Sequence, residues 1–230
     1  MVPSMFDIIG PVMVGPSSSH TAGALKIALI ARIICTNKDF KKITFTLFGS
    51  FSETYRGHGT DKALVAGLLG ISMDDLRVRD SLDIAKKKGI DVEFIEDRSI
   101  NNYHPNTVNI NIECTDGYKF RVLGESIGGG AIRIRMINDI RVRINGEHNA
   151  LILYLKNDPG MLARITAIIA SFDVGVEAMQ LYTNTDEDTS YIVIESQESI
   201  NLDLTSTLAK LPQVVTAIRF NLESIKNIDI

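Results

Sequence analysis

Cysteine is scarce in this chain of 230 residues, where only Cys35 and Cys114 occur, far apart in the sequence. Disulfide frameworks use several cysteine pairs, and zinc or iron–sulfur sites need about three or four ligands that are usually clustered. The sequence therefore argues against a disulfide scaffold and against a metal or iron–sulfur site made by this chain alone. Both cysteines are expected to be small buried hydrophobic residues.

Long hydrophobic runs and an excess of positive charge are also missing. No apolar run reaches the roughly 18 residues that span a bilayer, and the opening MVPSMFDIIG lacks the basic region and apolar run of a secretory signal. A net charge of −4 argues against nucleic-acid binding, which usually needs a basic face. We expect a cytoplasmic protein with no membrane or nucleic-acid partner, long enough for one large domain or two small ones.

The first half, residues 1–147, mixes helical spacing with alternating, strand-like stretches, so we expect an α/β domain. Helices are predicted at 20–35, 60–70 and 72–89. Strands are predicted at 41–51, 91–95, 107–124 (as a hairpin), 124–139 and 139–145.

The second half, residues 148–230, predicts the order strand, helix, strand, strand, helix, strand. This is the ferredoxin-like α+β arrangement, an antiparallel four-stranded sheet with two helices on one face. The strands are predicted at 149–157, 174–183, 188–196 and 213–220, and the helices at 158–172 and 201–211. The core face of the first helix is expected to carry Leu162, Ile165, Ile168, Ile169 and Phe172.

The stretch NDPGMLARI, which follows the first strand of the second half, resembles the ligand loop of an ACT domain. ACT domains are small regulatory modules that typically bind amino acids at dimer interfaces, and the resemblance covers nearly all of residues 148–222. It implies a homodimer through this half. A helix N-terminus suits a carboxylate, although the loop could equally be a plain turn in a module that only dimerises. The candidate effector residues are Asn157, Asp158, Gly160, Met161 and Leu162.

Polar side chains gather where two helices of the first half begin. GPSSSHTAGA, residues 15–24, precedes the first predicted helix with four hydroxyls on Ser17, Ser18, Ser19 and Thr21. Free N–H groups and the positive end of a helix dipole favour an anion there, and hydroxyls can donate to the same anion. One hydroxyl could instead be an ordinary N-cap, but four exceed what capping needs.

A histidine stands at each of these helix starts. His20 precedes the first helix, where a positive helix end should lower its pKa. His58 lies between two glycines in YRGHGTDKALVAGLLG, just before the second helix. If the two helix starts converge, the imidazoles and hydroxyls would form an acid–base site for a small carboxylate. Each histidine alone could also be a structural residue.

The stretches FDIIGPVMVGPSSSHTAGA and YRGHGTDKALVAGLLG resemble the β chain of the iron-sulfur-dependent L-serine dehydratase, in its two-chain form with a C-terminal ACT domain. GESIGGGAI, residues 124–132, matches a glycine-rich stretch of the same family. The resemblance implies loss of water from L-serine, with a product that collapses to pyruvate and ammonia. It also implies an α-chain partner that holds a 4Fe–4S cluster, whose open iron acts on the serine hydroxyl.

The resemblance also suggests residue roles, with no metal ligand in this chain. His20 and His58 would transfer the proton, and their order of importance stays open. Thr60 and Asp61 would orient His58 or bind the substrate ammonium, although either could instead cap the helix. The substrate carboxylate would be held by Ser17, Ser18, Ser19 and Thr21.

The first half also resembles the allosteric substrate-binding domain of some phosphoglycerate dehydrogenases, which precedes an ACT domain in the same order. That resemblance implies a rival function, a non-catalytic sensor of serine or another small anion. A sensor needs hydroxyls and N–H groups but no proton shuttle. The presence of both SSSHT and GHGTD therefore favours the enzyme subunit.

Overall fold

A computed structural model describes residues 13–35, 39–99, 102–184, 186 and 188–222. The first residues of the FDIIGPVMVGPSSSHTAGA stretch, 6–12, lie outside this range. The described chain forms two compact units that divide between Asp139 and Ile140. The boundary expected at 147/148 lies between the strands β6 (Ile140–Ile144) and β7 (Asn149–Lys156) of the second unit.

The first unit is an α/β domain, as expected. Its helical elements are η1 (Ser18–Gly23), α2 (Ala24–Ile34), α3 (Ser50–Thr54), α4 (Thr60–Leu69), η2 (Leu76–Asp80) and α5 (Ser81–Lys87). Its strands are β1 (Phe40–Phe48), β2 (Asp91–Asp97), β3 (Thr107–Cys114), β4 (Lys119–Gly128) and β5 (Ala131–Ile137).

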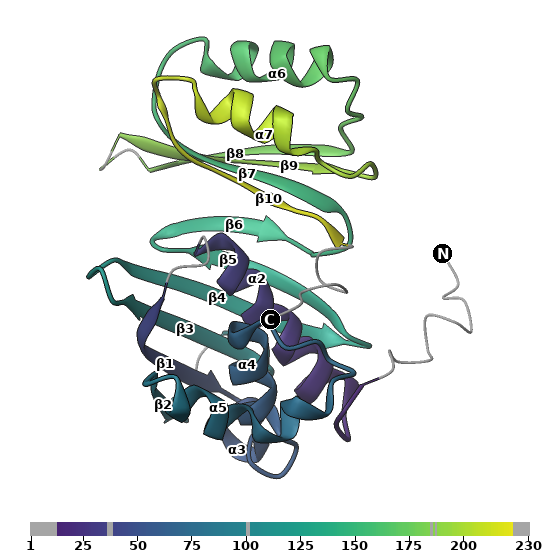
Figure 1. The fold of residues 1–230 in the computed structure, drawn as a ribbon, viewed down its shortest axis with the longest axis vertical. Helices are drawn as coiled ribbons and strands as arrows, with labels where there is room; N and C mark the ends of the chain where they lie inside the picture. The colour runs from purple at the N-terminus through teal and green to yellow at the C-terminus, as the bar shows by residue number, and fades with distance from the viewer. Residues whose placement is uncertain (1–12, 36–38, 100–101, 185, 187, 223–230) are drawn as a thin grey trace. The chain divides into compact units, whose positions relative to one another are not determined.

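The strands of this unit lie in the order β2-β1-β3-β4-β5. β1 and β2 are parallel, and the other neighbouring pairs are antiparallel. Helix α2 contacts β3, β4 and β5, and α4 packs beside it (Figure 1). This packing explains why most residues of α2 are buried, as its apolar sequence predicted.

Two glycines allow α2 to pack this closely. A Cβ at Gly67 of α4 would lie 2.3 Å from the carbonyl oxygen of Leu25, and one at Gly124 of β4 would lie 2.4 Å from Cγ2 of Ile27. Both distances are shorter than any normal contact, so the helix pair and the helix–sheet contact require glycine at these positions.

The helix predicted at 72–89 forms as two shorter pieces. Asp75 caps the 3₁₀ turn η2 by accepting a hydrogen bond from the backbone N–H of Arg77, and α5 begins only at Ser81. Side chains of Ser, Asp and Asn that bind nearby N–H groups favour caps over helix interiors. A single helix over this range was therefore a wrong prediction.

From β7 onward, the second unit has the strand and helix order that the sequence predicted. It contains β6 (Ile140–Ile144), β7 (Asn149–Lys156), α6 (Met161–Ser171), β8 (Ala178–Asn184), β9 (Thr189–Ser196), α7 (Leu202–Ala209) and β10 (Val214–Phe220). Four strands form an antiparallel sheet in the order β10-β7-β9-β8. From β7 onward this is the ferredoxin-like arrangement.

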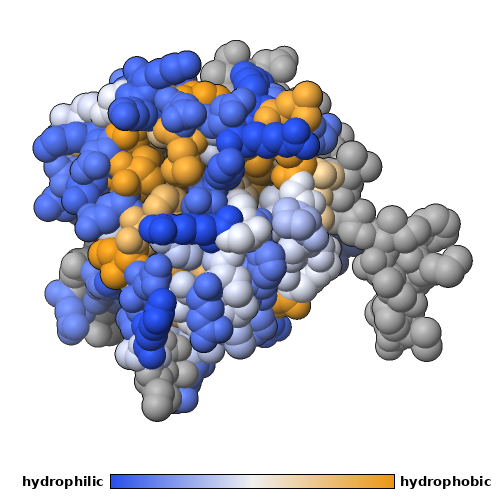
Figure 2. All heavy atoms as spheres, turned by 90° about the horizontal axis from the view of Figure 1, so that it is seen from below, coloured by the Kyte–Doolittle hydropathy of each residue, from blue (hydrophilic) through white to orange (hydrophobic). Residues whose placement is uncertain are grey.

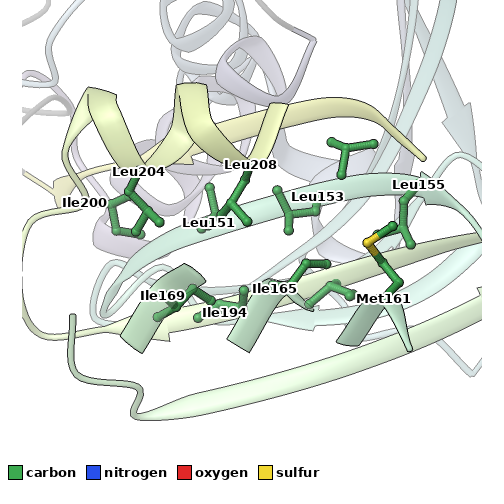
Figure 3. Packing of buried hydrophobic residues seen from close by; sticks show 12 residues of the cluster. Leu151, Leu153, Leu155, Met161, Ile165, Ile169, Ile194, Ile200, Leu204 and Leu208 are labelled. Carbon is green, nitrogen blue, oxygen red and sulfur yellow. The ribbon is translucent and has the colours of Figure 1, made fainter. Parts of the chain in front are cut away.

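The core of the second unit lies between its sheet and the helices α6 and α7 (Figure 3). Ile165 and Ile169 point into it as predicted, with Ile168 and Phe172 packed at its edge. Leu162 is 42% exposed, so its assignment to the core face was wrong. The helix begins at Met161, which is buried in the core where Leu162 was expected. Leu162 is one position (about 100°) further around the helix.

No helix within the described ranges is both long and apolar enough to cross a membrane. Figure 2 shows one face of the molecule, on which hydrophilic residues dominate and hydrophobic residues form smaller areas. Apolar area of this kind is ordinary on folded proteins and does not by itself indicate a binding surface.

Candidate active site

The first polar helix start is a π-helical turn, η1, that continues into α2. Ser17 is its N-cap: the backbone is extended, and the hydroxyl accepts the backbone N–H of His20 at 3.2 Å. The backbone N–H of Thr21 donates to the Ser17 carbonyl. Two N–H groups expected to face a ligand are thus already bound, and the capping alternative is correct for Ser17. Ser18 is half-buried, and its hydroxyl has no hydrogen-bond partner among the described residues.

The glycine-rich stretch at 124–132 contacts this turn through a residue that the sequence did not single out. The hydroxyl of Ser126 on β4 donates to the carbonyl of Ser19 at 2.8 Å. A Cβ at Gly23 would lie only 2.0 Å from the same hydroxyl oxygen. Ser126 therefore fixes the turn against the sheet, and the match to a glycine-rich family stretch was the only signal that pointed there.

The His20 ring is buried inside a group of hydroxyls. Its Nδ1 lies 3.3 Å from Oγ of Ser19 and 3.4 Å from Oγ of Ser17. Its Nε2 lies 3.1 Å from Oγ of Ser50, the first residue of α3. Which ring nitrogen donates depends on the tautomer. Ser50 is 30 residues away in the sequence, and no local pattern could have indicated this contact.

The second polar helix start places His58 directly before α4. Its N-cap is Gly59, in the left-handed conformation with φ 68°, and no side chain caps the helix. The prediction that Thr60 or Asp61 would be the cap was therefore wrong. Thr60 is the first helical residue, and its fully buried hydroxyl has no partner within the described chain. Asp61 accepts the backbone N–H of Lys62 at 2.8 Å from inside the first turn.

The two helix starts converge. The ring centroids of His20 and His58 are 4.6 Å apart, with the planes at 74°. The Thr21 hydroxyl donates to the His58 carbonyl at 3.2 Å, which joins the two segments directly. Phe51 also packs against the His20 ring, with the centroids 5.4 Å apart. The condition that the sequence left open, proximity of the two histidines, is met.

Burial controls the electrostatics of this site. It lowers the pKa of His20, and the nearby His58 lowers it further. The direction is the one expected from the sequence, but the main cause is loss of water rather than the helix end. Burial likewise raises the pKa of Asp61 above its usual range, because a charged carboxylate is poorly solvated there.

A cluster of metal ligands does not occur within the described residues, which contain no group of three or more His, Cys, Asp or Glu placed to hold an ion. Cys35 and Cys114 are both buried and not joined by a disulfide, and their sulfurs lie 3.8 Å apart. Because the two cysteines lie far apart in the sequence, their proximity in the fold could not be predicted from it. Two thiols alone do not match the ligand set of an iron–sulfur cluster.

The candidate effector loop of the second unit borders a cavity of about 630 Å³. Gly160, in the left-handed conformation, is the N-cap of α6. Asn157 is held by Asp188, with its side-chain amide donating to that carboxylate at 3.1 Å. Asp158 is ion-paired with Arg164. All five candidate residues line the cavity: Asn157, Asp158, Gly160, Met161 and Leu162.

Comparison with known proteins gives two family matches and close full-length relatives. The model of the serine dehydratase beta chain matches residues 4–93, and that of the AHAS small subunit-like ACT domain matches residues 151–216. The L-serine dehydratase beta chain of Peptoniphilus asaccharolyticus is 36% identical over 214 residues, covering 93% of this chain and 96% of that protein. The probable L-serine dehydratase beta chain of Bacillus subtilis (strain 168) is 38% identical over 212 residues, covering 92% and 95%.

A solved structure, the ACT domain from GTP pyrophosphokinase of Chlorobium tepidum, is 23% identical and covers 31% of this chain and 95% of its own, with a TM-score of 0.25. The ACT assignment therefore rests on the family model and on the strand order described above. Because two relatives match it at 36% and 38% identity over nearly their whole lengths, the chain belongs to the family of L-serine dehydratase β chains.

Proposed function

We propose that this chain is the β subunit of a two-chain L-serine dehydratase, which removes water from L-serine and yields pyruvate and ammonia. The observation that carries the proposal is the pair of imidazoles 4.6 Å apart at two converging helix starts. Elimination requires a base for the α-proton of serine and an acid for its hydroxyl. A histidine of this pair can supply the base near neutral pH.

The two histidines have different surroundings, and we assign them different roles. His58 lines a cavity of about 540 Å³ and is half-buried, so it can reach a substrate. His20 is buried and engaged at both ring nitrogens. His58 is therefore the better candidate for the base that takes the α-proton, and His20 for the group that orients it. The lowered pKa of His20 keeps the inner ring neutral, so that it adds no positive charge beside His58.

The proposed substrate-binding residues retain different capacities for a ligand. The hydroxyls of Ser17 and Ser19 already contact His20, and that of Thr21 donates to the His58 backbone. These three hydroxyls therefore position the two histidines more than they bind substrate. Ser18 and the buried hydroxyl of Thr60 have no such engagement within the described chain. We propose that these two hydroxyls, together with Asp61, take part in seating L-serine.

The 4Fe–4S cluster implied by the family does not fit the described residues of this chain, which offer no ligand group for it. We propose that the α chain holds it. When bound there, the cluster supplies a Lewis acid for the serine hydroxyl. The β chain would contribute the histidine pair and the hydroxyls to a shared site.

The second unit has a separate proposed role in dimerisation or amino-acid regulation. Its loop at 157–162 lies at the N-terminus of the 11-residue helix α6, a natural position for a carboxylate. Asp188 lines the same cavity and could accept an ammonium group. An amino acid carries both charges, so this cavity suits an amino-acid effector.

The test is to replace each histidine and to measure turnover and α-chain binding separately. His58→Gln should lower kcat by at least about a hundredfold, the usual contribution of a general base, and His20→Gln should lower it less. Both variants should still co-purify with the α chain, and Lys87→Gln, an exposed change on α5, should behave as wild type. Wild-type turnover in both histidine variants would end the acid–base proposal.

A further inference from the structure

The two cysteines of the chain meet at the ends of two elements of the first unit. Cys35 is the C-cap of α2, and Cys114 is the last residue of β3. They are 79 residues apart in the sequence, yet their sulfurs lie 3.8 Å apart and each residue is 1% exposed. A disulfide has an S–S length of about 2.05 Å, so the sulfurs would have to approach by less than about 2 Å. Rotation about the side-chain bonds moves a cysteine sulfur by this much.

Arg32 supplies a positive charge beside this pair. It lies one turn before Cys35 on α2. Its guanidinium donates to the Leu68 carbonyl at 2.8 Å and lies 5.9 Å from the centre of the Phe40 ring, and Phe40 is the neighbour of Cys114 across β1 and β3. Burial lowers the pKa of Arg32, and its interaction with Cys35 opposes that effect. A cation held near a thiol favours the thiolate, which is the form that reacts with oxidants.

Burial means that an oxidant reaches the two thiols only when the structure opens locally. Cys35 lies at the end of its helix, and Cys114 leads into an exposed turn at residues 115–118. The ends of helices and strands open at a lower free energy than their centres do. Hydrogen peroxide is small and uncharged, so a brief opening of this kind is enough to admit it.

We propose that Cys35 and Cys114 are a reversible oxidation site, which hydrogen peroxide converts into a disulfide. One thiolate attacks the O–O bond of the peroxide, which yields a sulfenic acid and a hydroxide that takes up a proton to become water. The second thiol attacks the sulfenic sulfur, forms the S–S bond and releases a second water. In total the two thiols lose two electrons and two protons, and one peroxide becomes two molecules of water. A dithiol reductant reverses the change by thiol–disulfide exchange and is itself oxidised.

The disulfide would connect the C-terminal end of α2 to the sheet of the first unit. It would close a loop of the chain that contains β1, α3, α4 and β2, together with Ser50 and His58. Closing a long loop restricts the unfolded chain more than the folded one, so the oxidised protein should be more stable. Because the cross-link holds α2 where it already lies, it should preserve the convergence of the two helix starts. The oxidation itself does not depend on the proposed reaction.

The test is to expose the full-length chain, without an α chain, to hydrogen peroxide at pH 7 and to count thiols after denaturation. Because the chain has only two cysteines, an internal disulfide leaves no thiol, removes two hydrogen atoms from the mass of the monomer and joins the peptides that carry Cys35 and Cys114. A dithiol reductant should restore both thiols. The melting temperature of the oxidised chain should exceed that of the reduced chain by at least about 5 °C.

Three variants separate the pair from general oxidation. Cys35→Ala retains one thiol, so it should form no internal disulfide, and peroxide should not raise its melting temperature. Arg32→Gln should slow disulfide formation about three- to tenfold, because the thiolate fraction falls about tenfold for each unit by which the pKa of a thiol rises. Arg98→Gln removes an exposed arginine just after β2 and should leave the rate unchanged.

The proposal is overturned if both thiols survive peroxide, if they gain oxygen without forming an S–S bond, or if they form disulfides only between chains. It is also overturned if the internal disulfide lowers the melting temperature, since the fold would then have to distort to form it. Equal rates in Arg32→Gln and Arg98→Gln would contradict the role assigned to Arg32. Because no turnover is measured, failure here leaves the proposed dehydratase function standing.

Discussion

At the scale of single residues, the site depends on two histidines with unequal access to water. His20 is enclosed by hydroxyls and by Phe51, whereas His58 borders a cavity. An enclosed ring keeps its orientation and its neutral form, and an accessible ring can meet a substrate. In the proposed mechanism, the pair combines a fixed inner group with an accessible outer one that takes the proton.

The lowered pKa of His20 predicts a pH-dependent stability. In the folded protein, burial holds this pKa below its ordinary value of 6.5. The unfolded chain takes up the proton near pH 6.5, so it binds more protons than the folded chain just below that pH. The free energy of unfolding should therefore fall as the pH drops from about 7 toward 5.

This prediction can be measured by urea unfolding at several pH values in that window. His20→Gln removes the titrating group, so its unfolding free energy should change less between pH 7 and 5 than that of the wild type. The quantity to compare is the change of the unfolding free energy with pH, because the substitution itself costs some stability at every pH. An equal dependence of the unfolding free energy on pH in the two proteins would contradict the assignment of this effect to His20.

Ser50 is expected to act as a positioning residue for His20. Its hydroxyl is the partner of Nε2 at 3.1 Å, and Ser50→Ala would leave that nitrogen buried without a partner. We expect kcat to fall about tenfold with little change in KM, since the ring would lose its orientation rather than its contact with substrate. Ser50→Thr keeps the hydroxyl and should restore most of the rate. Equal losses in both variants would indicate a packing effect instead.

At the scale of elements, the site exists because two helices begin at the same place. The π-turn η1 continues into α2, and the loop after α3 leads into α4. The helices α2 and α4 pack side by side. Their close approach depends on Gly67, where a Cβ would lie 2.3 Å from the Leu25 carbonyl and 2.9 Å from the Leu29 nitrogen. Movement of either helix would separate the histidines.

Gly67→Ala should therefore destabilise the protein, although alanine favours helices over glycine. The added methyl meets backbone atoms that cannot move independently, which typically costs about 1–3 kcal/mol of unfolding free energy. Gly57→Ala is the matched control, because its Cβ would meet only the Thr54 carbonyl, at 3.7 Å. Chemical denaturation of both variants checks this. A Gly67→Ala protein as stable as the wild type would show that the helices can separate at low cost.

The sequence predicted most of the elements, because hydrophobic spacing is a local signal. It did not predict the π-turn, the left-handed N-caps Gly59 and Gly160, or the division of the helix at 72–89. Those features depend on backbone conformations that tertiary packing selects. Contacts such as Ser50 with His20 join distant segments, and the sequence offers no spacing rule for them.

At the scale of the whole molecule, the chain carries two cavities of opposite character in separate units. The cavity of the first unit is lined by cations, and that of the second by Asp158 and Asp188 at a helix N-terminus. In the proposed function, the former brings L-serine to His58, and the latter takes an amino-acid effector. Chemistry and regulation would then be divided between the units, as the ACT domain match suggests.

Asp158→Ala should change the response to the amino-acid effector and leave the rate at saturating substrate unchanged. The carboxylate lines the effector cavity and is ion-paired with Arg164, so its loss alters both the charge of the cavity and the loop beside it. Asp203→Ala, an exposed change in the first turn of α7, is the control for loss of one negative charge. Serine dependence of the initial rate is the measurement. An unchanged response would favour a plain turn at this loop.

The most direct test of the central claim is an anaerobic pull-down from native cell extract with this chain as bait. The iron content of the eluate and its conversion of L-serine to pyruvate are both measured. The proposed function predicts an iron-bearing partner chain and serine-dependent pyruvate. An iron-free eluate that binds serine without consuming it would contradict the proposal and would favour a non-catalytic sensor of serine or another small anion.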